Sequence, residues 1–360
     1  MKMNFIKSSL IMGFALSSIL VAAQGISTPY SPGVTQDAIS YWLPKTKLTV
    51  KVTTTKRSFK PGEFSRYAER YLRMSQVKNK AEDVWEITDI SVMTSGVPDK
   101  DNLYTLAFPA KGNRPYFELT NDGILAAVNT HIQEESTGSQ EPTAQTGTQA
   151  KVNPQDYMTE EILMAGSTAK MAELTAKEIY NIRESRNAIT RGQADYVPTD
   201  GESLKYMLES LSQQEAALLT LFSGTNESEE HVFMIEVNPD ESLSKQVLFR
   251  FSLKLGVLPI DNLAGEPVWI DVKDYNMPGG QASESKAKTS KKGQGPFLYY
   301  RIPGRALVKV YNNRKSFLEQ DVQIAQFGNV EVVSSSIMGK HSDTKIVFDT
   351  TTGNVKSINE

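Results

Sequence analysis

Two apolar stripes at helical spacing lie near the middle of this 360-residue sequence, and they constrain the fold more than any other feature. The first stripe repeats at alternating steps of three and four residues, through Ile162, Ala165, Ala169, Ala172, Ala176 and Ile179. The second has similar spacing, through Leu204, Leu208, Leu211, Leu218 and Phe222. Because this spacing places apolar side chains on one face of a helix, each stripe predicts a helix that packs along that face.

Residues that start or stop helices mark the ends of both stripes. The first helix ends at Arg191-Gly192, and the second starts with the capping-box spelling Thr199-Asp-Gly-Glu202 and ends at Gly224. At about 1.5 Å per residue, the first helix would be roughly 45 Å long. A short proline-containing loop joins the two, so residues 156–224 are predicted to form a long antiparallel helical hairpin.

Segments on both sides of the hairpin alternate apolar and polar residues or are rich in strand-forming residues, which predicts β-strands. The N-terminal candidates are 48–53, 85–92, 103–108, 116–120 and 124–128. The tight-turn sequence Asn121-Asp-Gly123 predicts that the last two form a β-hairpin. The C-terminal candidates are 231–237, 247–251, 268–272, 298–302, 307–311, 322–327, 330–333 and 346–349.

The predicted fold class is therefore α+β, with two mainly antiparallel β regions separated by the helical hairpin. The N-terminal β-rich domain would span residues 24–133, and a sandwich-like C-terminal domain would span residues 225–360. Residues 134–155 are rich in Ser, Thr, Gln, Gly and Pro, which predicts a flexible linker or exposed loop. Residues 279–296 combine Gly and Ser with several lysines and are predicted to be a disordered loop between strands.

The chain contains no cysteine, which excludes disulfides, thiol catalysis, Cys-ligated zinc and iron–sulfur clusters. Its formal net charge of −3 gives no basic footprint and argues against nucleic acid as a partner. Hydrophobic residues make up 39% of the sequence, which is enough for a sizeable buried core.

The N-terminal segment has the three parts of a secretory signal. Lys2 and Lys7 are followed by the apolar run 10–20 and then by small residues up to Ala23, so cleavage is expected after Ala23 to leave Gln24 first. The run is shorter than the ~20 apolar residues that span a bilayer. No later segment qualifies as a membrane-spanning helix, and no Cys is present for a lipid anchor. The expected location is the periplasm or the periphery of the outer membrane.

The three histidines are the first candidates for a metal site, because each lies close to acidic residues. His131 precedes two glutamates by a few positions, His231 follows two, and His341 precedes Asp343. Imidazole and carboxylate together suit zinc or manganese. No two histidines have a ligand spacing such as H-x-x-x-H, so we interpret them as solvated residues of loops and strand ends. No metal or cofactor is predicted.

Motifs of the common enzyme classes are absent from the sequence. It has no G-x-S-x-G nucleophile elbow, no G-x-x-x-x-G-K-[ST] phosphate loop and no G-x-G-x-x-G after a strand. Glycosidase chemistry needs only two carboxylates at the right separation, and the pairs Asp271/Asp274 and Glu229/Glu230 are candidates for it. No catalytic residue is predicted, and the balance is against an enzyme.

Aromatic residues beside an arginine are the best candidates for a binding patch. Tyr299, Tyr300 and Arg301 follow Phe297, and strand alternation would direct some of these rings to an exposed sheet face that stacks on sugars or peptides. The alternative is that the rings pack in the β core. A second charged feature, Lys286, Lys288, Lys291 and Lys292, is interpreted as a solubilising loop rather than a site for lipid head groups or acidic glycans.

Three strings in the C-terminal region carry a resemblance to a known family. They are Leu298-Tyr-Tyr-Arg-Ile-Pro, Ala325-Gln-Phe-Gly and Phe348-Asp-Thr-Thr-Thr-Gly-Asn-Val-Lys-Ser-Ile. With the export signal and the central helical pair, they make the chain resemble an exported domain-of-unknown-function family of Gram-negative anaerobes. The resemblance implies export to the cell envelope and the predicted architecture. Its motifs are typical of turns and strands, so it implies no catalytic residue.

These observations predict a non-catalytic cell-envelope protein that binds a protein or polymer through the hairpin or an exposed sheet face. The alternative is a periplasmic hydrolase, such as a glycosidase, that works through paired carboxylates. A third hypothesis is a subunit of an outer-membrane assembly or secretion machine.

Overall fold

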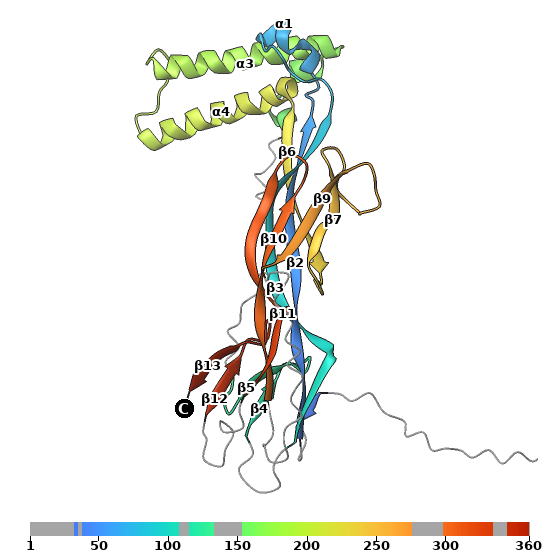
Figure 1. Cartoon of the computed structure of the whole chain (residues 1–360). Coiled ribbons are helices and arrows are strands. Elements are labelled where there is room, and N and C mark those ends of the chain that lie inside the picture. Colours follow the sequence, from blue (N-terminus) through green and yellow to red (C-terminus); the bar gives the residue numbers. More distant parts are fainter. Residues whose placement is uncertain are drawn as a thin grey trace, which may run out of the picture.

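Two long strands extend through the β part of the computed structural model, which describes residues 32–34, 38–107, 115–132, 153–275, 298–333 and 344–359. β2 (Ala38–Lys60) pairs in antiparallel register with β3 (Glu82–Ala107). At about 3.3 Å per residue, the 23 residues of β2 extend roughly 75 Å. β6 (Thr225–Val237) pairs with the C-terminal half of β2, and β1 (Gly33–Val34) pairs with its N-terminal end. The result is an elongated β rod with helices at one end (Figure 1).

A five-stranded antiparallel sheet lies against the long sheet, and the two enclose the main core. Its strand order is β11-β10-β9-β7-β8. The strands are β7 (Leu243–Ser252), β8 (Gly256–Leu258), β9 (Glu266–Asp274), β10 (Leu298–Tyr311) and β11 (Ser316–Val333). Val50 and Val52 from the long sheet share one core with Ile270 and Val308, and all four are fully buried. One of the two layers of this sandwich comes mainly from N-terminal strands, so the C-terminal region does not form the sandwich by itself.

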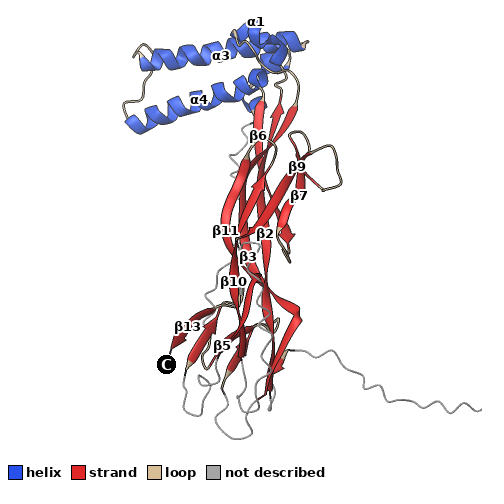
Figure 2. Ribbon diagram, viewed as in Figure 1, coloured by secondary structure: helices blue, strands red, loops and turns tan. Residues whose placement is uncertain are grey.

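A third sheet closes the end of the rod opposite the helices (Figures 1 and 2). It has the order β13-β12-β5-β4. Its strands are β4 (Phe117–Leu119), β5 (Leu125–Val128), β12 (Lys345–Phe348) and β13 (Val355–Asn359). The predicted hairpin at Asn121-Asp-Gly123 is confirmed, because β4 and β5 pair across it and Gly123 has a φ of 79° that suits glycine. A second core lies here and includes Tyr41, Leu298 and Ile346.

The two β regions, which the sequence analysis placed at residues 24–133 and 225–360, share sheets. β6 from the C-terminal region pairs with β2 over residues 48–60. β12 from the same region pairs with β5. Because each of these two sheets contains strands from both sides of the hairpin, the two regions form one β structure with the hairpin inserted between β5 and β6. The α+β class itself is confirmed.

The helical end of the molecule contains one long hairpin and several short segments. The long helices are α3 (Thr168–Thr190) and α4 (Gly201–Ser223), which extend sideways from the rod (Figure 2). Around their base lie η1 (Ser65–Tyr67), α1 (Ala68–Leu72), η2 (Pro154–Tyr157) and α2 (Glu160–Leu163). The structure thus contains the predicted hairpin, with two corrections to its boundaries.

The first correction concerns the length of the leading helix. The helix is interrupted between α2 and α3. Ser167 caps α3 by accepting a hydrogen bond from the Lys170 amide at 3.3 Å. The 23 residues of α3 correspond to about 35 Å rather than the predicted 45 Å. The second correction concerns the start of α4, where the capping residue is Asp200 and not Thr199. The Asp200 carboxylate accepts a hydrogen bond from the Ser203 amide at 2.8 Å.

The hairpin is held to the rod by a third core at its base. Phe64 and Ala68 pack there with Ala172 and Ile179 of α3 and with Phe222 of α4, and each is at most 3% exposed. The Ala seam contributes only in part, because Ala172 and Ala176 are buried whereas the others are not. Towards the free end, no residue before Glu215 of α4 is buried. The hairpin is therefore anchored at one end and exposed along the other.

Several predicted segments lie outside the described residues. These are the export signal with its cleavage position at Ala23 and Gln24, most of the 134–155 linker, and the lysine-rich loop at 279–296. Within the part of the chain that is described, no helix combines the length and the apolar character needed to cross a membrane.

Candidate functional site

The predicted binding patch lies at the start of β10, where internal contacts hold all three side chains. The half-buried Tyr299 stacks on Tyr104 with 4.5 Å between ring centroids, and Tyr300 lies 6.4 Å from the ring of Phe348. Arg301 is buried, with 6% of its surface exposed. A ligand-binding role for these residues stays a prediction.

Tyr41 fixes the position of Tyr299 through two hydrogen bonds to its backbone. The Tyr41 hydroxyl donates to the carbonyl oxygen of Tyr299 at 3.0 Å and accepts from its amide at 2.8 Å. The side chain of Tyr41 is fully buried, and this burial raises the pKa of its hydroxyl. The hydroxyl therefore stays protonated. On the edge of β10 away from β11, it takes the place of a neighbouring strand by pairing with the Tyr299 backbone.

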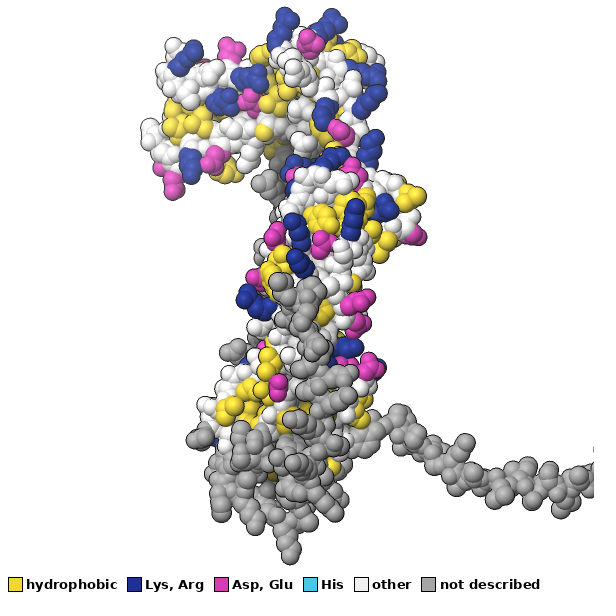
Figure 3. All heavy atoms as spheres, viewed as in Figure 1, with side chains coloured by type: hydrophobic (Ala, Val, Ile, Leu, Met, Phe, Trp, Pro, Cys, Tyr) yellow, Lys and Arg dark blue, Asp and Glu magenta, His cyan; other side chains and the backbone are white. Residues whose placement is uncertain are grey.

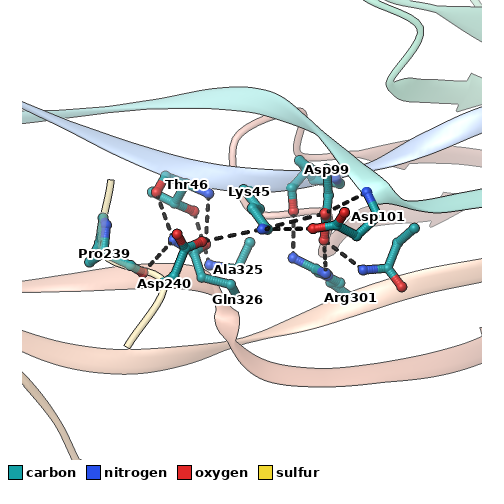
Figure 4. A network of polar contacts seen from close by, with 11 residues as sticks. Lys45, Thr46, Asp99, Asp101, Pro239, Asp240, Arg301, Ala325 and Gln326 are labelled. Atoms are coloured by element: carbon teal, nitrogen blue, oxygen red, sulfur yellow. Dashed lines mark hydrogen bonds and ion pairs between the residues drawn. The ribbon is translucent and has the colours of Figure 1, made fainter. Parts of the chain in front are cut away.

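Arg301 belongs to a buried ion pair that connects three elements (Figure 4). Its Nη2 donates to Oδ2 of Asp99 on β3 at 2.5 Å, and its Nη1 donates to the carbonyl oxygen of Pro44 on β2 at 2.9 Å. Asp99 is 1% exposed and also accepts from the Asn102 amide group at 2.7 Å. The Arg301 amide donates to the carbonyl oxygen of Gly353, beyond β12. This one side chain and its backbone therefore tie β10 to β2, β3 and the third sheet.

Lys45 lies beside this ion pair and is surrounded by carboxylates (Figure 4). Its Nζ is 3.2 Å from Asp240, 3.5 Å from Asp99 and 3.6 Å from Asp101. Burial acts to lower the pKa of Lys45, but the three carboxylates outweigh it and the pKa is raised. Lys45 therefore remains a cation and neutralises part of the acidic cluster.

Thr46 and Gln326 continue the network towards the sandwich. The Gln326 side chain accepts from the Thr46 amide at 2.8 Å and donates to the Thr46 carbonyl at 2.9 Å, so it pairs with β2 as a neighbouring strand would. The Thr46 hydroxyl donates to the carbonyl oxygen of Thr351 and accepts from the Ala325 amide, both at 2.9 Å. Gln326 also donates to the Pro239 carbonyl at 2.8 Å.

We call this region the waist, defined as residues 44–46 of β2 with Asp99, Arg301 and Gln326. Sequence reasoning found Arg301 but missed its partner Asp99 and the other side chains of the waist, Lys45 and Gln326. A signal was present, because the three strings that carry the family resemblance all meet here: Arg301 from the first, Ala325 and Gln326 from the second, and Thr351 and Gly353 from the third.

The electrostatics of the waist suit a structural clamp. Burial acts to raise the pKa of Asp99, but hydrogen bonds from Asn102 and the Asp101 amide and the charge of Arg301 hold it below its usual value. Asp99 is therefore ionised at neutral pH and has no proton to donate as a general acid. With Arg301 and Lys45 as cations, its charge is compensated on two sides.

Among the residues that the structure describes, the histidines make single contacts rather than a ligand cluster. His131 lies 3.2 Å from the Tyr116 hydroxyl and 3.5 Å from Glu118. The ring of His231 lies tilted against Trp85, with 4.8 Å between ring centroids, and is 3.7 Å from Glu229. His341 is outside the described residues. Within the described ranges, no group of three or more His, Asp or Glu side chains is arranged to hold a metal ion.

The carboxylate pairs nominated for hydrolysis are separated by strand geometry. Glu229 and Glu230 are consecutive on β6, and Asp271 and Asp274 are three residues apart on β9, both within regular pairing. Because successive side chains of a strand project from opposite faces, neither pair converges on one side of its sheet. Asp271 instead accepts hydrogen bonds from the Lys245 amide at 2.6 Å and the Tyr311 hydroxyl at 3.3 Å.

The free end of the hairpin is an exposed candidate surface. Tyr196, in the loop between α3 and α4, is 73% exposed, and Tyr206 on α4 is 76% exposed. Figure 3 shows hydrophobic side chains between the two helices near this end. Leu204 and Leu208, on the predicted apolar stripe, are half-buried and line a shallow pocket of about 530 Å³. We call these residues the hairpin tip, defined as 191–209.

An ion-pair cluster marks the inner boundary of the hairpin tip. Glu215, 7% exposed, lies between Arg183 and Arg186, at 2.6 Å and 2.8 Å. It joins α4 to α3 just beyond the apolar core at the base. The two helices are thus held together up to Glu215, and the apolar stripe of α4 continues past it with half-exposed leucines.

A comparison with curated proteins and with solved structures finds no match. A family model does match, and it covers residues 37–356, which include the long sheet, the hairpin, the waist and the third sheet. Since this range is most of the chain, the protein belongs to the family described as a domain of unknown function, DUF4831.

Proposed function

We propose that the protein is a non-catalytic component of the cell envelope that presents a helical hairpin at the end of a stiff β rod and binds a protein partner through the hairpin tip. The observation that carries the proposal is the exposure of Tyr196 and Tyr206 beside the half-buried Leu204 and Leu208. Exposed tyrosines with adjoining apolar surface are typical of protein-binding surfaces, because the ring buries much area at a small entropic cost.

The shape of the molecule supports this role. The hairpin extends sideways from the rod, so both helices are accessible over their outer halves (Figures 1 and 3). The buried waist and the continuous β2 strand make the rod a suitable spacer between the hairpin and the third sheet. The envelope location rests on the expected signal at residues 1–23.

Site-specific photo-crosslinking in envelope extracts tests the proposal. A benzoylphenylalanine would replace Tyr196 or Tyr206, and the matched control would replace Tyr275, an exposed tyrosine at the end of β9 that is 47% exposed. We expect one discrete adduct from the hairpin positions and none from position 275. Equal adducts from all three positions, or none from any of them, would contradict the proposed role of the hairpin tip.

A further inference from the structure

A pocket of about 400 Å³ opens on the rod, at the end of the sandwich nearer to the helices. It lies between the β7–β8 turn, the β10–β11 turn and the start of β3. Phe251 and Phe317 contribute aromatic surface, and Ile87 and Leu253 contribute aliphatic surface. The two rings are partly buried against the main core. The aromatic and aliphatic part of the pocket is therefore continuous with the main core, and polar and charged side chains line the rest.

The β7–β8 turn is held in place above Trp85. The Trp85 amide donates to the carbonyl oxygen of Leu253 at 2.8 Å. Gly256, with φ of 77°, lies so close to the indole that an added Cβ would be 2.8 Å from the ring. These contacts fix the turn that carries Leu253 and Lys254, so this wall of the pocket is preformed.

The acidic residues of the pocket are already paired with arginines. Glu266 accepts from Arg314 at 2.8 Å, and Glu86 lies 3.1 Å from Arg57. Both pairs are exposed to solvent at the rim. The charges of both carboxylates are therefore partly neutralised by the two arginines.

Two lysines at the rim have no such partner. Within the described residues, no carboxylate lies within ion-pair distance of Lys254 or Lys315. Lys315 instead holds its Nζ 4.7 Å from the centre of the Phe317 ring. The pKa of Glu82 is lowered mainly by Lys78, with which it forms an ion pair at 2.6 Å, and also by the charge of Lys254. Among the described residues, the rim therefore carries two lysines outside any ion pair, next to the aromatic and aliphatic surface of the pocket.

We propose that this pocket binds a carboxylate carried on a short hydrophobic body, either a small organic acid or the free C-terminus of a peptide. The apolar walls remove the hydrophobic body from water, and Lys254 and Lys315 pair with the carboxylate. The volume is near the lower limit for ligand pockets, which favours a short body over a long acyl chain. A monoanion suits the recess better than a dianion, because the apolar walls make removal of each charge from water costly.

Calorimetric titration of the purified protein with 4-phenylbutyrate tests the pocket, with 4-phenylbutan-1-ol as the uncharged control. We expect saturable binding of the acid and at least about tenfold weaker binding of the alcohol, since a charge-assisted contact is lost. The double variant Lys254→Gln/Lys315→Gln should weaken the acid about tenfold and leave the alcohol unchanged. Lys273→Gln, at an exposed lysine of β9, should change neither.

Tripeptides ending in phenylalanine distinguish the two sources of the carboxylate. If Ala-Ala-Phe binds at least about tenfold more tightly than 4-phenylbutyrate, and its C-terminal amide does not bind, the ligand is a peptide terminus. If the small acid binds as well as the peptide, the ligand is a free organic acid. Absence of saturable binding by every probe, or binding that the double lysine variant does not weaken, would overturn the proposal. The readout is separate from partner capture at the hairpin tip, so each proposal fails on its own.

Discussion

At the scale of single residues, the waist shows how a buried charge can serve architecture. Asp99 and Arg301 are both almost fully buried, yet every strong polar group around them has a partner. A buried ion pair of this kind adds little net stability compared with an apolar packing, but it fixes geometry, because loss of one partner leaves a charge without compensation. Three sheets meet at this point, so a specific contact sets their relative positions.

Removal of the guanidinium is therefore expected to be costly. Arg301→Met should lower the free energy of unfolding by about 3–5 kcal/mol, because Asp99 remains buried without its countercharge. Adding Asp99→Asn to this variant should recover part of the loss. The control variant Arg305→Met changes a residue on the same strand as Arg301 and removes an exposed ion pair with Asp321 of β11. It should leave the unfolding free energy close to wild type. Urea denaturation gives the unfolding free energies of the wild type and the three variants. Equal losses of unfolding free energy for Arg301→Met and Arg305→Met would contradict a structural role of the buried ion pair.

The lowered pKa of Asp99 gives the waist a defined pH dependence. In the folded protein this carboxyl binds its proton only below the pH at which the unfolded chain does, so stability rises with pH between the two pKa values. The contribution is complete above the unfolded pKa of about 4 and is lost as the pH falls through the lowered folded value. The urea midpoint of the wild type should thus fall more steeply below about pH 4 than that of Asp99→Asn. Parallel curves for the two proteins would show that another carboxylate governs acid unfolding.

At the scale of elements, the hairpin combines an apolar base with an exposed tip. Ala172 and Ala176 let α3 approach its neighbours closely, and Phe64 and Phe222 pack at 5.5 Å between ring centroids beneath them. Beyond Glu215 the stripe of α4 continues, but its leucines are half-exposed. Since most of the stability of helices in proteins comes from packing of an apolar face, the base supplies most of the stability of the hairpin.

A charge placed in this base should loosen the hairpin. Ala172→Glu puts a carboxylate where the native residue is fully buried, and we expect a loss of about 3 kcal/mol or more. Ala169→Glu, at a half-buried position one turn earlier, should cost less, and Lys177→Glu on the exposed face should cost little. Thermal unfolding followed by circular dichroism at 222 nm ranks the three variants. An unchanged transition for Ala172→Glu would mean that α3 does not pack through this face.

At the scale of the whole molecule, the sequence was informative about elements and less so about their assembly. Period-two segments and the two heptad stripes predicted most strands, both helices and the α+β class. The stripes did not reveal the break before Ser167, because Ile162 and Ala165 continue the spacing across it. The pairing of β2 with β6 and of β5 with β12 joins residues at least 165 positions apart, and alternation within a strand carries no information about its distant partner. The same limit applies to the waist, where only Arg301 was recognised.

Because β2 passes through both β cores, the two β regions are expected to unfold as one cooperative unit. Trp42 lies at the end near the third sheet and Trp269 lies on β9 of the sandwich, so each reports on the unfolding of one β region. Two variants that retain only one of these tryptophans, with the others replaced by Phe, should show the same urea midpoint by fluorescence. Independent domains at residues 24–133 and 225–360 would instead give two separated midpoints. Arg301→Met should lower both midpoints if the waist couples the two cores. A shift of only one midpoint would show that the waist does not couple them.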